Sequence, residues 1–230
     1  MPANPLPTKI GIVLFPGFQL LDAAGPLDAF HLLSQQTTLN LSILAANIEP
    51  VPTQTWAQDK QGSKFSPSIV PTHAFADAPT DLEMILVPGG LGTRGPNGEE
   101  RPHMAPVVDF LKSLDLSGKG SLKWLLTVCT GSEVLSRTGV LNGRRATTNK
   151  RAFNDVKAKH PNVKWIAQAR WVVDGNIWTS SGISAGMDLA FAWISEVFGE
   201  DVAQYVADRS EYDRNVEPDN DRYAERWGAV

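Results

Sequence analysis

The sequence contains a single cysteine, Cys129, among its 230 residues. One cysteine excludes an intrachain disulfide and a thiolate metal cluster. A lone thiol is typical of a protein kept in a reducing compartment, so we expect a cytoplasmic location. Any chemistry that needs a thiol therefore depends on Cys129.

Long hydrophobic runs and an excess of basic residues are also missing. No apolar stretch approaches the roughly 20 residues that cross a bilayer, and the N-terminal MPANPLPTK lacks the apolar region of a secretory signal. Lys and Arg number 21 against 25 Asp and Glu, a net charge of -4 that lacks the basic footprint of nucleic-acid binders. There is no nucleotide-binding glycine loop and no metal-ligand spacing. We expect no membrane, nucleic-acid, metal or cofactor partner.

What the sequence has is an alternation of strands and helices. Four short segments are apolar at nearly every position, which is typical of strands buried on both faces. These segments are 9–15, 39–46, 84–90 and 122–128. Helical patterns separate and follow them, at 20–33 (most securely from Pro26), 103–114, 132–139, 151–159 and 184–199. This order predicts an α/β fold with a mainly parallel sheet covered on both faces.

The rest of the chain indicates one domain. Asp174-Gly175 is a hairpin-type turn between the strand-like segments 163–173 and 176–181. No repeat or linker divides the sequence. We expect a flexible arm at 1–8, a single α/β domain at 9–212 and a polar surface tail at 213–230.

The sharpest motif is LLTVCTGSEVL, in which a buried strand runs into Cys129 and a helix begins two or three residues later. This is the nucleophile-elbow arrangement, with cysteine in place of serine and Gly131 two positions on. The first amides of the helix would stabilise a thiolate, so we expect a lowered thiol pKa. The alternative is that Cys129 is a small buried hydrophobe.

A nucleophile needs a proton partner, and Asp22 is the candidate. It lies just past the first strand in FPGFQLLDAAGP, and in a parallel sheet that strand end lies at the same edge as Cys129. Its apolar neighbours would raise the carboxyl pKa and let Asp22 carry a proton. A helix N-cap role is the alternative, and the residues alone leave both open. The histidines are expected on helix faces or the surface: His31, His73, His103 and His160.

Glycines at another strand end favour binding of a developing negative charge. In VPGGL, Gly90 lets the backbone approach a ligand closely. We predict that Gly90, Leu91 and Thr130 form the oxyanion or substrate-binding site, with the Thr130 amide as one donor; a simple turn is the alternative for PGG. The basic segment GRRATTNKR at 143–151 is expected to be a solvated face rather than a phosphate site.

With these motifs in place, the chain resembles the ThiJ/PfpI superfamily, whose fold is related to class I glutamine amidotransferase domains. The blocks that carry the resemblance are IGIVLFPGFQLLDAAGPLDAF, MILVPGG, VCTGSEVLSRTGVLNGRRATT and DGNIWTSSGISAGMDLAFAWI. Within the superfamily the chain is most similar to the isonitrile (isocyanide) hydratase branch. Asp22 matches the aspartate of that branch, and Thr130 follows the cysteine where protease-like relatives carry histidine. One departure is Asn149-Lys150, where hydratases tend to have histidine and an aromatic residue.

The resemblance implies a flavodoxin-like three-layer sandwich, a homodimer, and a catalytic site of Cys129, Asp22 and Thr130. It implies cofactor-free hydration of a small isonitrile to an N-substituted formamide through a thioimidate on Cys129. A glutathione-independent glyoxalase or carbonyl-adduct hydrolase is a rival enzyme. A non-catalytic redox sensor is a rival of another class. A sensor half of a transcription regulator is disfavoured, because the sequence ends without a helix-turn-helix segment.

Overall fold

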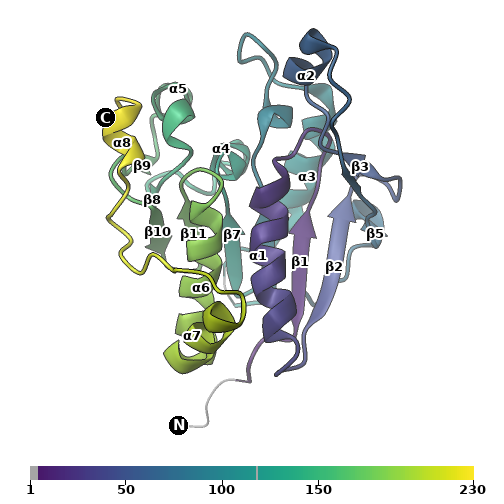
Figure 1. The fold of residues 1–230 in the computed structure, drawn as a ribbon. Coiled ribbons are helices and arrows are strands. Elements are labelled where there is room, and N and C mark those ends of the chain that lie inside the picture. The colour runs from purple at the N-terminus through teal and green to yellow at the C-terminus, as the bar shows by residue number, and fades with distance from the viewer. Residues whose placement is uncertain (1–4, 118) are drawn as a thin grey trace.

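The computed structural model describes residues 5–117 and 119–230. Within these residues seven strands form one sheet in the order β10-β11-β7-β6-β1-β2-β5 (Figure 1). The strands are β1 Lys9–Val13, β2 Asn40–Ala45, β5 His73–Ala74, β6 Met84–Val87, β7 Trp124–Thr127, β10 Trp171–Asp174 and β11 Ile177–Ser180. All neighbouring pairs are parallel except β10 with β11. The predicted α/β class with a mainly parallel sheet is confirmed.

Helices cover the sheet on both faces. One face carries α1 Leu20–Leu33, α6 Ala185–Phe198 and α7 Glu200–Arg209, and the other carries α3 Ala105–Ser113 and α4 Gly131–Ser136 (Figure 1). Trp193 of α6 is fully buried and packs edge-to-face on Phe30, Trp124 and Phe198. Such aromatic burial supplies much of the hydrophobic stabilisation that joins α1 and α6 to the sheet.

Smaller elements lie around the ends of the sheet. Two short pairs, β3 Val51–Pro52 with β4 Ser68–Ile69 and β8 Arg145–Ala146 with β9 Lys164–Trp165, are separate from it. The remaining helices are α2 Trp56–Gln61, α5 Phe153–Lys159 and α8 Tyr223–Arg226. Single 3₁₀ turns occupy Phe75–Asp77, Leu91–Thr93, Pro102–Met104 and Lys150–Ala152.

The register of β6 and β7 positions the cysteine. Val87, the last residue of β6, lies beside Thr127, the last residue of β7. The chain therefore leaves both strands at the same edge, and the glycines after β6 meet the elbow after β7. This adjacency follows from the parallel sheet, as the sequence predicts.

The structure differs from the sequence prediction in several element bounds. The first helix begins at Leu20, so Pro26 lies inside it rather than in its first turn. The segment predicted as one strand at 163–173 is divided into β9 and β10, which belong to different sheets. The helix α7 was not predicted, because only a few of its residues, Ala203, Val206 and Ala207, are buried. Of the expected arm, residues 1–4 lie outside the described residues, and the Thr8 N–H donates to Glu83 Oε2 at 2.7 Å.

The C-terminal stretch lies on the surface but is anchored to the domain at three buried residues. It runs along one side of the molecule and returns to the edge of the sheet that carries Cys129 (Figure 1). Asp221 is buried, and its carboxylate lies 3.7 Å from Lys150 Nζ. Ala224 and Ala229 pack on Phe153 of α5. Most of its residues are exposed, as the polar composition suggests, and the buried Asp221, Ala224 and Ala229 hold the segment against the domain.

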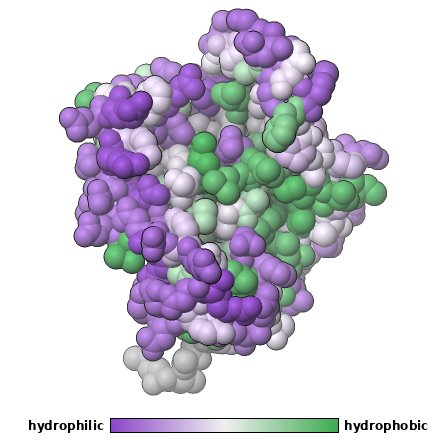
Figure 2. Space-filling view, in the orientation of Figure 1, coloured by the Kyte–Doolittle hydropathy of each residue, from purple (hydrophilic) through white to green (hydrophobic). Residues whose placement is uncertain are grey.

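The face drawn in Figure 2 carries apolar side chains over α1 and the β2 side of the sheet, within a largely polar surround. Exposed apolar residues of these segments are Leu20, Leu21, Leu41, Ile48 and Val70. Among the described residues, no helix has both the length and the apolar character that crossing a membrane requires.

The contact between α4 and the end of β6 yields a stability prediction. A Cβ on Gly131 would lie 2.3 Å from the Val87 carbonyl oxygen, a backbone atom that cannot turn aside. We expect Gly131→Ala to lower the free energy of unfolding by about 3 kcal/mol, because the helix must move away from the strand. Urea denaturation measures this loss.

Gly186→Ala in α6 is the matched control. The three atoms nearest to its Cβ all belong to the Val128 side chain, the closest at 2.5 Å, and a side chain adjusts more readily than a backbone carbonyl. A loss at Gly131 no larger than the loss at Gly186 would contradict the rigid contact described above.

Candidate active site

Cys129 occupies a strained turn between β7 and α4. Its φ angle is +58°, in the left-handed region that non-glycine residues rarely adopt. The turn is held by the Cys129 N–H, which donates to the Ser181 carbonyl at 3.0 Å, and by the Thr148 hydroxyl, which donates to the Cys129 carbonyl at 3.1 Å. Strain of this kind, fixed by surrounding hydrogen bonds, is typical of an active-site nucleophile.

Asp22 faces the cysteine from the first turn of α1. Gln19 is the N-cap of that helix, so Asp22 is not its N-cap. The Gly89 N–H donates to Asp22 Oδ2 at 3.0 Å, and the carboxyl group and the Cys129 thiol are near enough for each to shift the pKa of the other. Within the described residues the buried Oδ1 has no hydrogen-bond partner. The structure thus brings together Asp22 and Cys129, which are far apart in sequence.

Burial controls the protonation of this pair. It raises the pKa of Asp22 to about 7, although the Gly89 N–H and the thiol stabilise the carboxylate. Burial also raises the pKa of the Cys129 thiol, and the nearby Asp22 charge raises it further. The Thr130 and Ile183 N–H groups and the Asn149 amide oppose that rise.

The expected lowering of the thiol pKa by the helix is therefore wrong. The α4 helix has six residues, and the Cys129 residue is only 6% exposed. Desolvation of a thiolate in such a setting outweighs the stabilisation that a short helix supplies. The resting pair is a neutral thiol next to a carboxyl group that ionises near neutral pH.

The loop after β6 lies against Thr130. The Gly90 N–H donates to Thr130 Oγ1 at 3.0 Å, so in this structure that N–H is already used. Gly90 has a φ of +137°, and a Cβ there would lie 2.5 Å from the Gln19 nitrogen. Leu91 also lines the pocket, and within the described residues its N–H has no hydrogen-bond partner. The free amide at this strand end is thus that of Leu91 rather than of Gly90.

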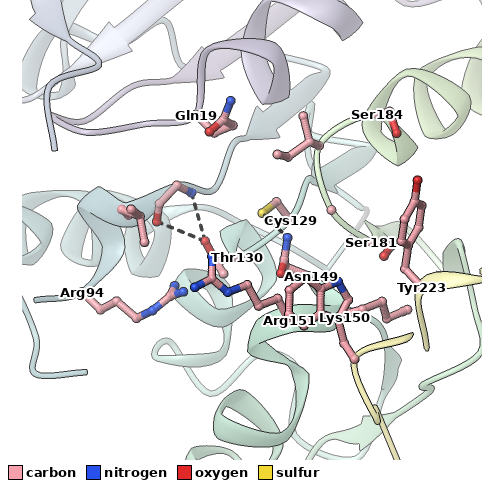
Figure 3. Close-up of a pocket in the computed structure, with 15 residues that line it drawn as sticks. Gln19, Arg94, Cys129, Thr130, Asn149, Lys150, Arg151, Ser181, Ser184 and Tyr223 are labelled. Carbon is pink, nitrogen blue, oxygen red and sulfur yellow. Dashed lines mark hydrogen bonds between the residues drawn. The ribbon is translucent and has the colours of Figure 1, made fainter. Parts of the chain in front are cut away.

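Asn149 is a site residue that the sequence analysis did not assign. Its Nδ2 donates to Cys129 Sγ at 3.2 Å, and its Oδ1 accepts from the Ala152 N–H at 3.3 Å (Figure 3). The second bond fixes which end of the amide faces the sulfur. The departure from the hydratase pattern at 149 was the available signal, since this position adjoins the nucleophile.

A cavity of about 440 Å³ opens above the cysteine (Figure 3). Its walls come from the loops after β6, β8 and β11, and from α8 through Tyr223 and Trp227. Ile183, in the loop after β11, is a second strained wall residue, with φ at +48°. The α8 residues could not be found from the sequence, because that stretch has the composition of a tail.

The basic side chains of the segment at 143–151 lie in three different environments. Arg144 Nη1 lies 3.5 Å from Asp174 Oδ1. Lys150 is buried, its Nζ donates to Thr147 Oγ1 at 2.6 Å, and burial lowers its pKa to about 8 against the Asp221 charge. Arg151 reaches the pocket. The segment is therefore not one solvated face.

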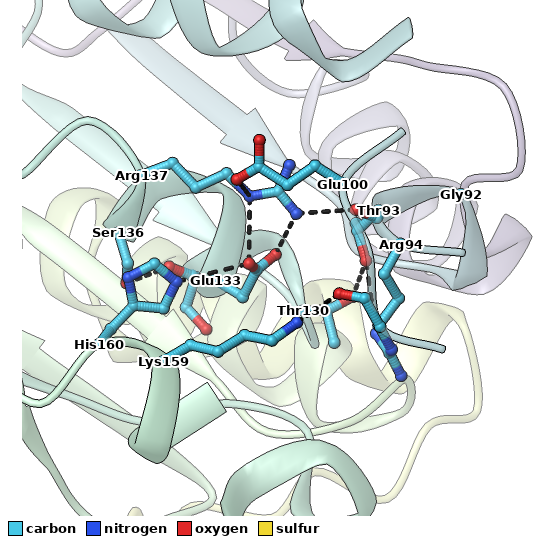
Figure 4. A network of polar contacts seen from close by, with 12 residues as sticks. Gly92, Thr93, Arg94, Glu100, Thr130, Glu133, Ser136, Arg137, Lys159 and His160 are labelled. Atoms are coloured by element: carbon cyan, nitrogen blue, oxygen red, sulfur yellow. Dashed lines mark hydrogen bonds and ion pairs between the residues drawn. The ribbon is translucent and has the colours of Figure 1, made fainter. Parts of the chain in front are cut away.

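A buried ionic network supports the elbow from behind (Figure 4). Glu133 of α4 accepts from Arg137 Nη2 at 2.7 Å, and His160 Nε2 lies 3.4 Å from its other oxygen. Arg137 Nη2 also donates to the Thr93 carbonyl at 2.7 Å, and the Thr93 hydroxyl reaches Thr130 Oγ1 at 3.5 Å. This chain of contacts ties α4 to the loop that follows β6.

The histidines do not line the cavity. His160 belongs to the network above, and His103 Nε2 lies 2.9 Å from the Gly92 carbonyl. Among the residues that the structure describes, no three His, Cys, Asp or Glu side chains are grouped as a metal site requires. The pocket lining offers the Cys129 thiol, hydroxyl and amide groups and the cationic side chains of Arg94, Lys150 and Arg151, and the Asp22 carboxyl group lies buried next to the thiol.

The family model for DJ-1/PfpI matches residues 8–196. The chain belongs to the DJ-1/PfpI family. An isonitrile hydratase of Pseudomonas putida is 36% identical over 205 residues, 89% of this chain and 78% of that protein. The transcriptional regulator GbdR of Pseudomonas aeruginosa is 26% identical over 213 residues, which are 93% of this chain and 53% of the regulator.

Solved structures of DJ-1/PfpI proteins share the fold. A THiJ/PfpI family protein from Pseudomonas syringae has a TM-score of 0.70 at 26% identity, over 91% of this chain and 76% of that one. Drosophila melanogaster DJ-1beta has a TM-score of 0.67 at 21% identity, over 90% of this chain and 100% of that one. The predicted superfamily and the flavodoxin-like sandwich are confirmed.

The buried Asp22 carboxyl predicts a pH-dependent stability of this DJ-1/PfpI protein. Its pKa rises from 3.8 to about 7 in the folded state. Between those values the native state keeps a proton that the unfolded chain has lost, so stability falls as pH rises, by about 4 kcal/mol in total. Asp22→Asn removes this cost, and its stability relative to wild type should increase from pH 4 to pH 8.

Urea unfolding of wild type and variant at several pH values in that window measures the effect. Asp219→Asn, at an exposed carboxyl group, is the matched control. A stability difference for Asp22→Asn that stays constant with pH would show that Asp22 is ionised throughout the window.

Proposed function

We propose that the protein hydrates a small isonitrile to an N-substituted formamide, with Cys129 as nucleophile and Asp22 as proton carrier. The observation that carries the proposal is the buried pair of Asp22 carboxyl group and Cys129 thiol at the base of a pocket. The similarity to an isonitrile hydratase over 89% of the chain supports it. The family also includes proteins named as regulators and deglycases, so the reaction rests on the site chemistry.

The first half-reaction forms a covalent thioimidate. Asp22 carboxylate accepts the thiol proton as Sγ attacks the terminal carbon of the isonitrile, and the new C–S bond leaves an electron pair on that carbon. Asp22 then gives the proton to the carbon. Because the same proton leaves sulfur and arrives at carbon, the pair returns to its starting charge.

The second half-reaction adds water to the same carbon. Asp22 carboxylate accepts a proton from the attacking water and passes that same proton to the substrate nitrogen, which returns Asp22 to the carboxylate. The resulting tetrahedral adduct carries hydroxyl, sulfur and amine on one carbon. Breaking the C–S bond releases the formamide, and the hydroxyl proton goes to the thiolate, which regenerates the thiol.

Amide donors stabilise polar intermediates in this scheme. The Thr130 N–H faces Sγ, and the Leu91 N–H has no other partner among the described residues. Asn149 Nδ2 stabilises the sulfur whenever it carries negative charge. We assign Gly90 to the pocket wall, where its lack of a side chain allows the close approach to Gln19.

The homodimer and the cytoplasmic location expected from the sequence belong to this proposal. The apolar surface over α1 in Figure 2 is compatible with a subunit contact.

Formation of formamide tests the reaction. Wild-type protein should convert cyclohexyl or phenyl isonitrile to the formamide, Cys129→Ala should be inactive, and Asp22→Asn should be about 10²–10⁴-fold slower because it cannot move the proton. Product is measured by liquid chromatography with the thiol confirmed as reduced. Full activity of Cys129→Ala would sink the mechanism, and faster turnover of methylglyoxal by wild type would favour the glyoxalase.

The pH dependence of kcat/KM tests how many protons the Cys129 thiol and the Asp22 carboxyl group hold together when attack occurs. Attack requires the state in which thiol and carboxyl group together hold one proton, and this state forms as pH rises through the Asp22 pKa of about 7. We therefore expect kcat/KM to increase with pH and to reach a plateau above pH 7, and Asp22→Asn to lose this limb. A kcat/KM that falls between pH 6 and pH 8 would contradict the assignment.

A further inference from the structure

The pocket has an unbalanced charge. Its lining includes three cationic side chains, Arg94, Lys150 and Arg151, and no carboxylate among the described residues. Asp22 lies below it but is buried behind the cysteine. An apolar isonitrile would not need cations in the wall, so each one requires an explanation.

One of the three is already neutralised. Lys150 Nζ lies 3.7 Å from the buried Asp221 carboxylate, and it donates to Thr147 Oγ1 and to the Ala169 carbonyl at 2.7 Å. Its role is to hold the C-terminal stretch in place. Since Lys150 is paired with Asp221, the uncompensated positive charge of the pocket is that of the two arginines.

Neither arginine has an acidic partner within the described residues. Arg94 Nη1 donates to the Thr93 hydroxyl at 3.3 Å, and no carboxylate lies within ion-pair distance. Glu100, which pairs with Arg94 through a backbone bridge, directs its carboxylate to Arg137 at 3.9 Å. Arg151 likewise has no carboxylate partner.

Both guanidinium groups are held in place by neutral contacts. Thr93 fixes Arg94, and the Arg151 guanidinium carbon lies 5.6 Å from the centre of the Trp227 ring. In Figure 3 the two side chains extend toward each other beneath Thr130. Two oriented, unpaired guanidinium groups at a partly buried mouth have the donor geometry that carboxylates bind.

We propose that Arg94 and Arg151 bind a carboxylate on the substituent of the substrate. The carbon to be attacked lies at Cys129, and Tyr223 and Trp227 of α8 contact the body of the substituent. This inference rests on the proposed function for the identity of the reacting group. It names the substrate class as isonitriles whose substituent ends in a carboxylate, and the product as the corresponding formamido carboxylate.

Kinetics with paired substrates test the proposal. We expect wild type to prefer 4-isocyanobenzoate over its methyl ester by at least about 10-fold in kcat/KM, since a charge-assisted pair is worth at least that factor. The ratio should fall toward 1 in Arg94→Gln with Arg151→Gln, and added salt should lower it in wild type. Arg145→Gln with Arg209→Gln, at two exposed arginines outside the pocket, removes the same two charges and should keep the wild-type ratio.

Binding without turnover separates this proposal from the reaction. In Cys129→Ala, calorimetry should find 4-formamidobenzoate bound at least about 10-fold more tightly than its methyl ester, and the two arginine substitutions should abolish the difference. Equal binding of acid and ester, in a protein whose unfolding transition is intact, overturns the carboxylate site. Formamide formation with no preference for the acid keeps the reaction and rejects the site. A binding preference without any formamide keeps the site and rejects the reaction.

Discussion

The pairing of the Cys129 thiol with the buried Asp22 carboxyl group is the constraint on which the site depends. The two acidic groups share one buried space that accommodates one negative charge: burial raises the pKa of both, and the Asp22 charge raises the thiol pKa further. The surrounding backbone keeps them together: the elbow fixes the sulfur, and the Gly89 N–H fixes the carboxylate. The contacts of Gly89 and Gly131 with neighbouring backbone leave this arrangement no room to relax.

The rest of the pocket is built from loops and from the end of the chain. Its floor belongs to the sheet edge that carries Cys129, whereas the 149–151 segment and the C-terminal Tyr223 and Trp227 supply walls from outside the sheet. Lys150 and Asp221 form the link between them, because this buried pair joins the loop that carries Asn149 to the stretch that carries Tyr223. The reacting side chains therefore come from the end of β7 and from α1, whereas the side chains proposed to select the substrate come from loops and from the C-terminal stretch.

The site could be predicted where it follows from topology. A strand that ends in cysteine and leads into a helix predicts the elbow, and parallel strands bring their ends to one edge, so Cys129, Asp22 and the glycine loop were expected together. The protonation of the thiol could not be predicted, since it depends on burial rather than on the helix that follows. Asn149, Tyr223 and Trp227 were missed because loop conformations and an ion pair between distant residues place them. The predicted span 20–33 matches α1, but Pro26, which proline preference assigns to a first turn, lies inside the helix.

The path of the C-terminal stretch affects how the protein should be handled. The start of β1 and the C-terminus lie at opposite ends of the molecule (Figure 1), and the last residues are bound near the pocket: the Val230 carbonyl accepts from Lys157 Nζ at 2.9 Å, and Trp227 is part of the cavity wall. An affinity tag or fusion partner at the C-terminus would therefore stand beside the entrance used by substrate. Attachment at the N-terminus leaves that entrance clear.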